Sequence, residues 1–224
     1  VCDSDASRAA DIGEEFGCQY VTDAASLSSL GIDMVTIATP TPSHAKLAIQ
    51  MMYAGLDVLV EKPLAMSVEE GEEVIRVSEE TGCLLLVGHV FRHHAGIRTA
   101  AEIINSGKMG PIRHIVSERL AVREPRDDIG VIAALGIHDF DICVDLLGGV
   151  LPSSMSGMAS VSSIEGIEDH AELQLEFSPQ TDGEERIMAS IHLSWRSRIR
   201  GKVRSLEVIG RDASLNVDYM DHSG

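Results

Sequence analysis

The sequence predicts an α/β fold, with a doubly wound parallel sheet followed by an α+β domain whose sheet is mostly antiparallel. Short, near-continuous apolar runs rich in β-branched residues occur at 33–39, 57–61 and 83–90. Such runs are typical of strands buried on both faces of a parallel sheet. Helical patterns separate them, and a strict alternation of strand and helix indicates right-handed βαβ units. Later segments alternate with a period of two, as antiparallel strands do when one face is packed.

Two helices are expected between the early strands. The segment 43–55 carries one helical stripe, and Gly55 offers a stop. The segment 67–82 begins with Ser67 and has Glu70 three residues later, which is a capping-box signature. The stripe of the first helix consists of Ala45, Ala48, Ile49 and Met52.

The pattern changes after about residue 92, so we expect two domains, 1–91 and 92–224. A helix over 94–106, a strand near 112–122 and a helix over 138–147 are predicted first. Alternating strands follow at 171–177 and 215–219. The first of these should bury Ala171, Leu173, Leu175 and Phe177. As a helix, the segment 134–149 should bury Ile137, Phe140, Val144 and Leu147.

Composition excludes several function classes. A formal net charge of −17 over 224 residues disfavours nucleic-acid binding, because a phosphate backbone would be repelled. No apolar run approaches the roughly 18 residues of a membrane span. The four cysteines are widely spaced without a CxxC pair, which favours reduced thiols in a cytoplasmic protein and no structural zinc. No signal peptide opens the chain, and Val1 falls within an expected strand, so we expect a truncated sequence.

The first candidate site is Asp3 in "VCDSD". An acidic residue that ends the second strand of a dinucleotide-binding fold holds the adenosine ribose by its hydroxyls. The glycine-rich turn of such a fold should precede Asp3 by about 20 residues, and the sequence does not contain it. The alternative is helix capping, for which the neighbouring Ser4, Asp5 and Ser7 are also suited.

The second candidate is the loop "ATPTPSH" at 38–44. Two prolines and small hydroxyl residues follow a parallel strand, where ligands of such sheets bind. Thr39 and Pro40 lie in this loop, and His44 lies in the first turn of the next helix. An ordinary βα loop capped by Ser43 explains the pattern equally well.

The third candidate is Lys62 in "VLVEKPLA", between Glu61 and Pro63. It also follows a parallel strand, and proline restricts the residue before it, which should give the lysine a defined direction. A partly desolvated lysine has a lowered pKa and exchanges protons near neutrality. The alternative is a solvated loop lysine paired with Glu61.

Histidines form two further candidates. In "ALGIHDFDICVDLLGG" at 134–149, His138, Asp141 and Asp145 share a helical stripe, so Asp141 could orient the imidazole of His138. The alternative is a structural histidine. The cluster "GHVFRHH" could hold a metal with His138 or Asp141, but nothing in the spacing fixes a coordination geometry, and we assign no metal ligand. Its histidines are His89, His93 and His94.

These motifs occur in the order and spacing of the Gfo/Idh/MocA family of NAD(P)-dependent sugar oxidoreductases, and the resemblance covers nearly the whole chain. "DHAELQLEF", "LSWRSRIR" and "LEVIGRDASLNVDY" resemble the C-terminal sheet of that family. The segment "PRDDIGV…GIHDFDI" is most similar to members that oxidise the 3-hydroxyl of UDP-N-acetylglucosamine. The resemblance implies that 1–91 is a Rossmann-type domain lacking its first strand and glycine loop. It also implies that 92–224 is a substrate-binding and oligomerisation domain.

The resemblance also implies roles for single residues. Lys62 and His138 would be catalytic, with Lys62 near the nicotinamide and the substrate hydroxyl, and His138 as acid/base or substrate orienter. Arg92 and Asp141 would join them in binding substrate. The cofactor would be NAD, because the Asp3 carboxylate would repel the 2′-phosphate of NADP. NADP stays an alternative. Its binding residues would be Asp3, Thr39, Pro40, His44, Glu61 and Lys62.

The implied function is hydride transfer between a nicotinamide cofactor and a hydroxyl or keto group of a sugar, sugar nucleotide or cyclitol. The implied assembly is a homodimer or homotetramer. Two departures bear on it: Ala134 stands where the family commonly has an aspartate, and the glycine turn is missing. A non-catalytic NAD(P)-binding sensor of the same fold, and a metal-dependent hydrolase built on the histidine cluster, are the alternatives.

Overall fold

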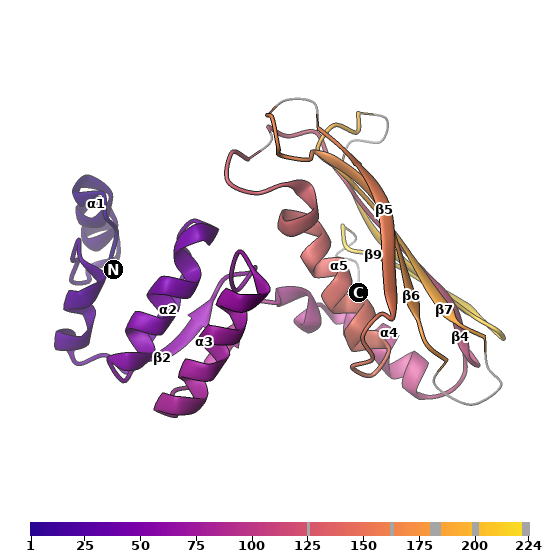
Figure 1. Cartoon of the computed structure of the whole chain (residues 1–224), viewed down its shortest axis with the longest axis horizontal. Helices are drawn as coiled ribbons and strands as arrows, with labels where there is room; N and C mark the ends of the chain where they lie inside the picture. Colours follow the sequence, from indigo (N-terminus) through magenta and orange to yellow (C-terminus); the bar gives the residue numbers. More distant parts are fainter. Residues whose placement is uncertain (125, 162–163, 180–184, 199–201, 221–224) are drawn as a thin grey trace. The chain divides into compact units, whose positions relative to one another are not determined.

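A computed structural model describes residues 1–124, 126–161, 164–179, 185–198 and 202–220. The chain divides into two compact units, Val1–Gly88 and His89–Gly224 (Figure 1). Three residues of the motifs quoted above, Pro125, Ile199 and Arg200, lie outside the described part of the chain. No helix in the described ranges has the length and apolar character that crossing a membrane requires.

The first unit contains the predicted parallel sheet. Strands β1 (Met34–Ile37), β2 (Asp57–Val60) and β3 (Leu85–Val87) are hydrogen-bonded in the order β1-β2-β3, and both pairs are parallel. Helix α2 (His44–Tyr53) connects β1 to β2, and helix α3 (Val68–Thr81) connects β2 to β3. The three early strands and the two helices between them are therefore confirmed, with ends shifted by a few residues.

The helices cover one face of this sheet, which corrects the expectation of strands buried on both faces. Val58 and Val60 lie in a core with Met52 of α2. On the other face Met34 is 57% exposed and Leu86 is 63% exposed. Each new strand is added on the same side of the last, and right-handed crossovers then place α2 and α3 on the same face.

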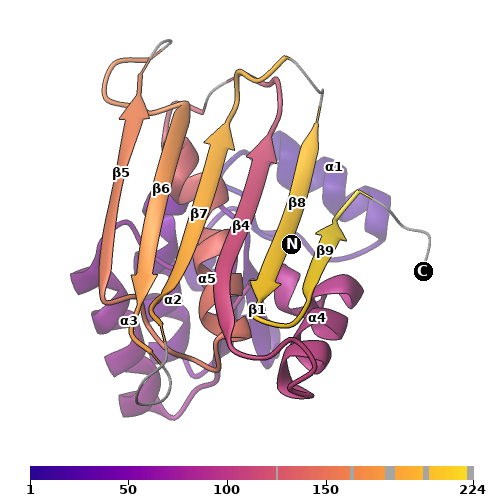
Figure 2. The same cartoon turned by 90° about the vertical axis from the view of Figure 1, so that its right-hand side faces the viewer.

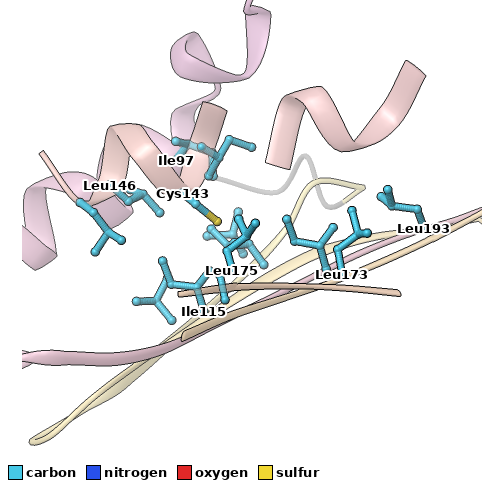
Figure 3. Packing of buried hydrophobic residues seen from close by; sticks show 14 of the residues in the cluster. Ile97, Ile115, Cys143, Leu146, Leu173, Leu175 and Leu193 are labelled. Atoms are coloured by element: carbon cyan, nitrogen blue, oxygen red, sulfur yellow. The ribbon is translucent and has the colours of Figure 1, made fainter. Parts of the chain in front are cut away.

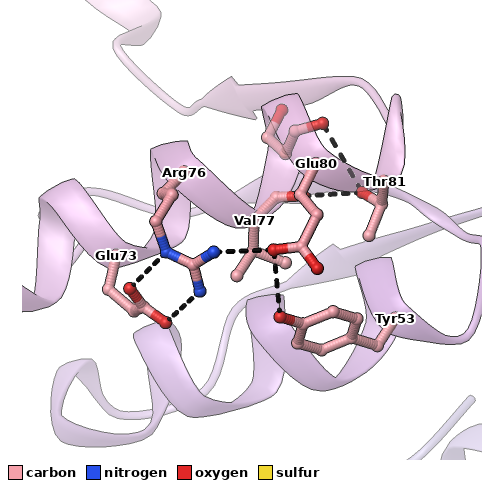
Figure 4. A network of polar contacts seen from close by, with 7 residues as sticks. Tyr53, Glu73, Arg76, Val77, Glu80 and Thr81 are labelled. Carbon is pink, nitrogen blue, oxygen red and sulfur yellow. Dashed lines mark hydrogen bonds and ion pairs between the residues drawn. The ribbon is translucent and has the colours of Figure 1, made fainter.

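Helix α3 is stabilised at its start and along its surface. The Ser67 hydroxyl accepts a hydrogen bond from the backbone N–H of Glu70 at 3.2 Å, as the capping signature predicts. The Glu70 carboxylate accepts from Met66, one residue before the partner that a full capping box would give it. On the exposed side, the Arg76 guanidinium binds both Glu73 and Glu80 (Figure 4).

The chain before β1 forms two more helices. Helix α1 (Ala6–Phe16) starts at Asp5, whose carboxylate accepts from the N–H groups of Ser7 and Arg8. A 3₁₀ helix, η1, spans Ala24–Leu30. The expected strand at the start of the chain is represented in the structure by a single parallel bridge between Cys2 and Val21.

The second unit is a six-stranded sheet in the order β5-β6-β7-β4-β8-β9 (Figure 2). The pair β4–β7 is parallel, and the other four pairs are antiparallel. The mostly antiparallel sheet is therefore confirmed. Its strands are β4 (Ile112–Leu120), β5 (Ser154–Ser160), β6 (His170–Phe177), β7 (Ile187–Ser194), β8 (Val203–Gly210) and β9 (Ser214–Asp218).

Helices pack on one face of this sheet and enclose the larger core (Figure 3). They are α4 (Ala95–Asn105) and α5 (Ile137–Leu146), with a short 3₁₀ helix, η3 (Val90–His93), before α4. Burying one leucine in such a core contributes roughly 1.5–3 kcal/mol. The predicted alternation in β6 is confirmed, since the side chains that face the core are Ala171, Leu173, Leu175 and Phe177.

Helix α5 turns a different face to the core from the one predicted. Of the expected residues, Leu147 just after the helix is buried, while Phe140 and Val144 are only partly buried. The buried side chains within the helix are His138, Asp139, Ile142, Cys143 and Leu146. Asp139 can lie inside because Arg119 of β4 pairs with its carboxylate. Ile137 is also only partly buried, so the buried stripe lies on another side of the helix than the predicted one.

Candidate functional site

Two loops with candidate residues leave the same edge of the parallel sheet. Residues 38–43 follow β1 and residues 61–65 follow β2, and these neighbouring strands run in the same direction. The carboxyl edge of such a sheet is where ligands bind. Thr39 and Pro40 in the first loop are exposed, and Lys62 in the second is partly buried.

His44 braces these two loops. Its Nε2 lies 2.8 Å from the carbonyl oxygen of Thr39, and its Nδ1 lies 2.8 Å from the carbonyl oxygen of Pro63. The side chain is 1% exposed, and both ring nitrogens are engaged by backbone carbonyls. A carbonyl can only accept, so the ring donates to both when it carries two protons. The imidazole therefore ties the loop after β1 to the residue that follows Lys62.

Glu61 and Pro63 flank Lys62 along the chain. Its backbone N–H donates to the Glu61 carboxylate at 3.3 Å, and the Lys62–Pro63 peptide bond is cis. The Glu61 carboxylate lies against Gly88, where an added Cβ would come within 3.4 Å of it. Glu61 is thus directed back across the sheet edge, next to the end of β3.

Asp3 is a charged group rather than a helix cap. The N-cap of α1 is Asp5, so Asp3 is not the residue that caps this helix. The Asp3 carboxylate accepts from the N–H of Asp5 at 2.9 Å and from the Arg8 guanidinium at 3.0 Å. Those two interactions, the backbone hydrogen bond first, hold the pKa of the Asp3 carboxyl below its usual value. Asp3 therefore presents a carboxylate next to a guanidinium at neutral pH.

In the second unit, Arg92 and Asp141 form a bidentate pair. Nε and Nη2 of Arg92 lie 2.6–3.0 Å from the Asp141 carboxylate, and Nη1 lies 3.4 Å from Asp145. His89 Nδ1 is 3.6 Å from the same Asp141 carboxylate. Asp141 and Asp145, which share a stripe of the predicted helix, therefore both face Arg92. Asp141 was expected to orient His138, and in the structure both of its oxygens are engaged by Arg92.

His138 lies one residue into α5 and is 8% exposed. The ring of Phe91 packs edge-on against it, with centroids 4.8 Å apart. Ala134, at the position for which the family resemblance implies an aspartate, lies in a π-helical turn (Ile132–Gly136) that runs directly into α5, and it is buried. The turn before His138 therefore offers a methyl group where a carboxylate would face the core.

Sequence reasoning missed a buried polar cluster next to His138. The Asp139 carboxylate accepts from Arg119 Nε at 2.8 Å and from the Ser117 hydroxyl at 2.7 Å. Burial raises the pKa of the Asp139 carboxyl, and the Arg119 guanidinium acts in the opposite direction. The guanidinium also stacks on Phe91, 4.2 Å from its centroid. The cluster therefore reaches the ring that packs on His138.

His89 and His94, on either side of η3, make contacts with other parts of the second unit. His94 Nδ1 accepts from the N–H of Gly96 at the start of α4, and His89 faces Asp141. Within the described ranges, the set of three or more side chains whose ligand atoms converge is His170, Glu172 and His192.

Both halves of the chain match models of known families. Residues 1–89 match the oxidoreductase family with an NAD-binding Rossmann fold. Residues 97–216 match the GFO/IDH/MocA C-terminal domain.

Individual relatives agree with these matches. A UDP-N-acetylglucosamine 3-dehydrogenase of Acidithiobacillus ferrooxidans is 29% identical over 100% of this chain and 67% of its own. A solved structure of such an enzyme from that organism has a TM-score of 0.83 at 30% identity, over 97% and 65% of the two chains.

Two further relatives have other substrates. A 2,7-anhydro-N-acetylneuraminate hydratase of Mediterraneibacter gnavus is 26% identical over 95% of this chain and 59% of its own. A scyllo-inositol 2-dehydrogenase (NAD(+)) of Bacillus subtilis is 29% identical over 88% and 58%. The chain spans about three fifths to two thirds of the length of the curated relatives described here.

Proposed function

Because the chain belongs to the Gfo/Idh/MocA oxidoreductase family, we propose that it carries out hydride transfer between NAD and a sugar-type alcohol. The substrate class is a sugar, sugar nucleotide or cyclitol. The observation that carries the proposal is Lys62 at the carboxyl edge of a parallel sheet in an NAD-binding unit, on a loop that His44 fixes. The relatives named above supply the substrate class.

Lys62 and His138 have complementary roles in this proposal. When bound, NAD supplies the hydride acceptor, and the protein must manage the proton of the alcohol. Lys62 polarises the reacting hydroxyl and stabilises the developing alkoxide. His138 accepts the hydroxyl proton or orients the sugar, and Phe91 limits its motion. Arg92 and Asp141 hydrogen-bond the remaining hydroxyls.

The residues of the first unit fit an NAD molecule in part. Asp3 offers a charged carboxylate for the ribose hydroxyls, and Thr39 and Pro40 offer an exposed loop at the ligand edge. His44 does not fit a direct role, since carbonyl groups engage both ring nitrogens. We assign it to positioning of the two loops instead. Arg8 beside Asp3 gives the ribose end a cation as well, so NADP belongs in the binding test.

The test is an assay on the full-length gene product. NADH formation is followed with NAD and UDP-N-acetylglucosamine, free N-acetylglucosamine, scyllo-inositol and myo-inositol, and NADP replaces NAD in parallel reactions. We expect saturable turnover on at least one polyol or sugar nucleotide. Absence of turnover across the panel, with the protein folded and NAD bound, would contradict the proposal.

NAD binding without turnover on any of these substrates would favour the alternative of a non-catalytic sensor. Ala134 is the observation that supports it, because the buried turn before His138 lacks the family's carboxylate. A sensor would bind NAD tightly, as calorimetry would report, and leave every alcohol unreacted.

We also propose that the full-length protein is cytoplasmic and forms a homodimer or homotetramer. The four cysteines are widely spaced without a CxxC pair, and this spacing supports reduced thiols and a cytoplasmic location. Light scattering on the purified full-length protein gives the mass of the assembly directly. A monomer over a wide concentration range would overturn this part alone.

A further inference from the structure

Two histidines and a glutamate gather on the outer face of the second unit's sheet. His170 and Glu172 are on β6, and His192 is on β7. Their side chains alternate with Ala171, Leu173 and Ile191, which face the core, so they lie on the opposite face. The antiparallel register places Glu172 directly opposite His192 and His170 opposite Ser194. The three residues therefore occupy neighbouring positions of one ladder.

The ligand atoms are close enough to share an ion. One nitrogen from each histidine and one carboxylate oxygen all lie within 4.8 Å of one another. In a tetrahedral zinc site with bonds of roughly 2.0–2.1 Å, ligand atoms lie about 3.4 Å apart. The two imidazole rings already stand edge to face, with centroids 5.2 Å apart. Small side-chain rotations on a fixed backbone would close the remaining gap.

A fourth ligand is available from the other neighbour of β7. Glu118 on β4 lies opposite His192 in the parallel register, and its carboxylate is 3.8 Å from His192 Nδ1. His192 therefore lies between two glutamates across three adjacent strands. The nearby Arg196 guanidinium is paired with Asp169 and Ser160, which reduces its repulsion of a cation here.

We propose that His170, Glu172 and His192 bind one zinc ion, with Glu118 or water in the fourth position. Two imidazoles and one carboxylate are a donor set that suits zinc, whereas magnesium and calcium prefer all-oxygen ligands. The ion would join β6 to β7 on the face away from the helices. The net charge of −17 favours a cation at this surface.

The proposal is tested by zinc titration of the untagged full-length protein, first stripped with EDTA and desalted. We expect calorimetry to give one zinc per chain. His192→Ala should weaken the zinc affinity by more than about tenfold. Removing a residue that only hydrogen-bonds a metal ligand already costs about that much, and His192 is a ligand itself. His114→Ala is the matched control: this histidine is on β4 of the same sheet, bonds to Ser190 and is outside the cluster. It should bind zinc as the parent does.

Two results would overturn the proposal. One is the absence of saturable binding at one equivalent, and the other is unchanged affinity in His192→Ala. If His192→Ala does not fold, as circular dichroism would show, exposed Glu172→Gln provides the same comparison. Cobalt as a probe separates this site from the cysteines, because thiolate ligands add a charge-transfer band. Such a band would place the metal elsewhere and would also refute the assignment.

Discussion

The guanidinium of Arg119 on β4 pairs with the carboxylate of Asp139 on α5 inside the core of the second unit. Nε lies 2.8 Å from both carboxylate oxygens, and the side chains are 2% and 0% exposed. Removing two charges from water costs several kcal/mol each, and their attraction offsets this cost only while both remain. The pair fixes α5 on the sheet, and with it the position of His138.

Arg119→Met should therefore destabilise the fold strongly, because it leaves the Asp139 carboxylate buried without its partner. We expect a loss of about 3–5 kcal/mol in the free energy of unfolding. Urea denaturation followed by tryptophan fluorescence measures it. Arg113→Met, which removes a half-exposed arginine on β4 of the same unit, should leave the midpoint nearly unchanged. Equal midpoints for the two variants would contradict this account of the pair.

Lys62→Ala should lower kcat by about 10²- to 10⁴-fold, the usual contribution of a group that handles a reacting proton. NAD affinity should change little, since the cofactor keeps its other contacts. Steady-state kinetics and calorimetry with NAD measure the two effects on the full-length protein. Lys62→Arg keeps the charge and should restore part of the rate. Turnover unchanged in Lys62→Ala would remove this residue from the mechanism.

His138→Ala should lower kcat and remove one limb of the pH profile of kcat/KM. The reason is that the limb reports ionisation of an essential acid or base in the free enzyme. His138→Gln retains hydrogen-bonding capacity and should recover substrate affinity more than rate. A profile identical to that of the parent would make His138 a structural residue, packed on Phe91.

His44→Leu should reduce both stability and turnover. Leucine removes the ring that bridges the carbonyl groups of Thr39 and Pro63, and a carbonyl left unpaired out of reach of water costs about 1–3 kcal/mol. The loop that carries Lys62 should then move more freely, so kcat should fall more than NAD affinity. His93→Leu, at an exposed position, is the control. A drop in NAD affinity with kcat unchanged would point instead to direct cofactor contact.

The four thiols should react at very different rates. Burial, with a smaller effect of Asp139, raises the pKa of the Cys143 thiol, so it stays protonated when the pH is raised toward 9. Cys18 is exposed and should react with a thiol reagent within seconds to minutes. Cys143 should react only after denaturation, as mass spectrometry of the labelled peptides would show. Early labelling of Cys143 in the native protein would mean that α5 opens locally.

Much of the fold could be predicted because its sequence signals are local. The alternation in β6 gave the correct buried face, and Ser67 marked the start of α3 through its own hydrogen bond. The face of α5 could not be found in this way. Asp139 looks like a surface residue until Arg119, twenty positions earlier, is seen to neutralise it.

The sites show the same limit. Lys62 and His44 are candidates because they lie beside prolines and strand ends, but the contact between the His44 ring and the Pro63 carbonyl depends on two loops meeting. The His170, Glu172 and His192 cluster has no sequence signature, because its members come together only through the register of β6 and β7. Such a cluster can be found only after the pairing of the two strands is known.

The position of β4 in the middle of the sheet has a consequence for biosynthesis. β4 ends at Leu120, yet its two neighbours, β7 and β8, begin only at Ile187 and Val203. While a ribosome makes the intervening segment, both edges of β4 lack their final partners. Unpaired edges attract other chains. Nascent chains that stall before Val203 should therefore depend on chaperones, while released full-length chains should not.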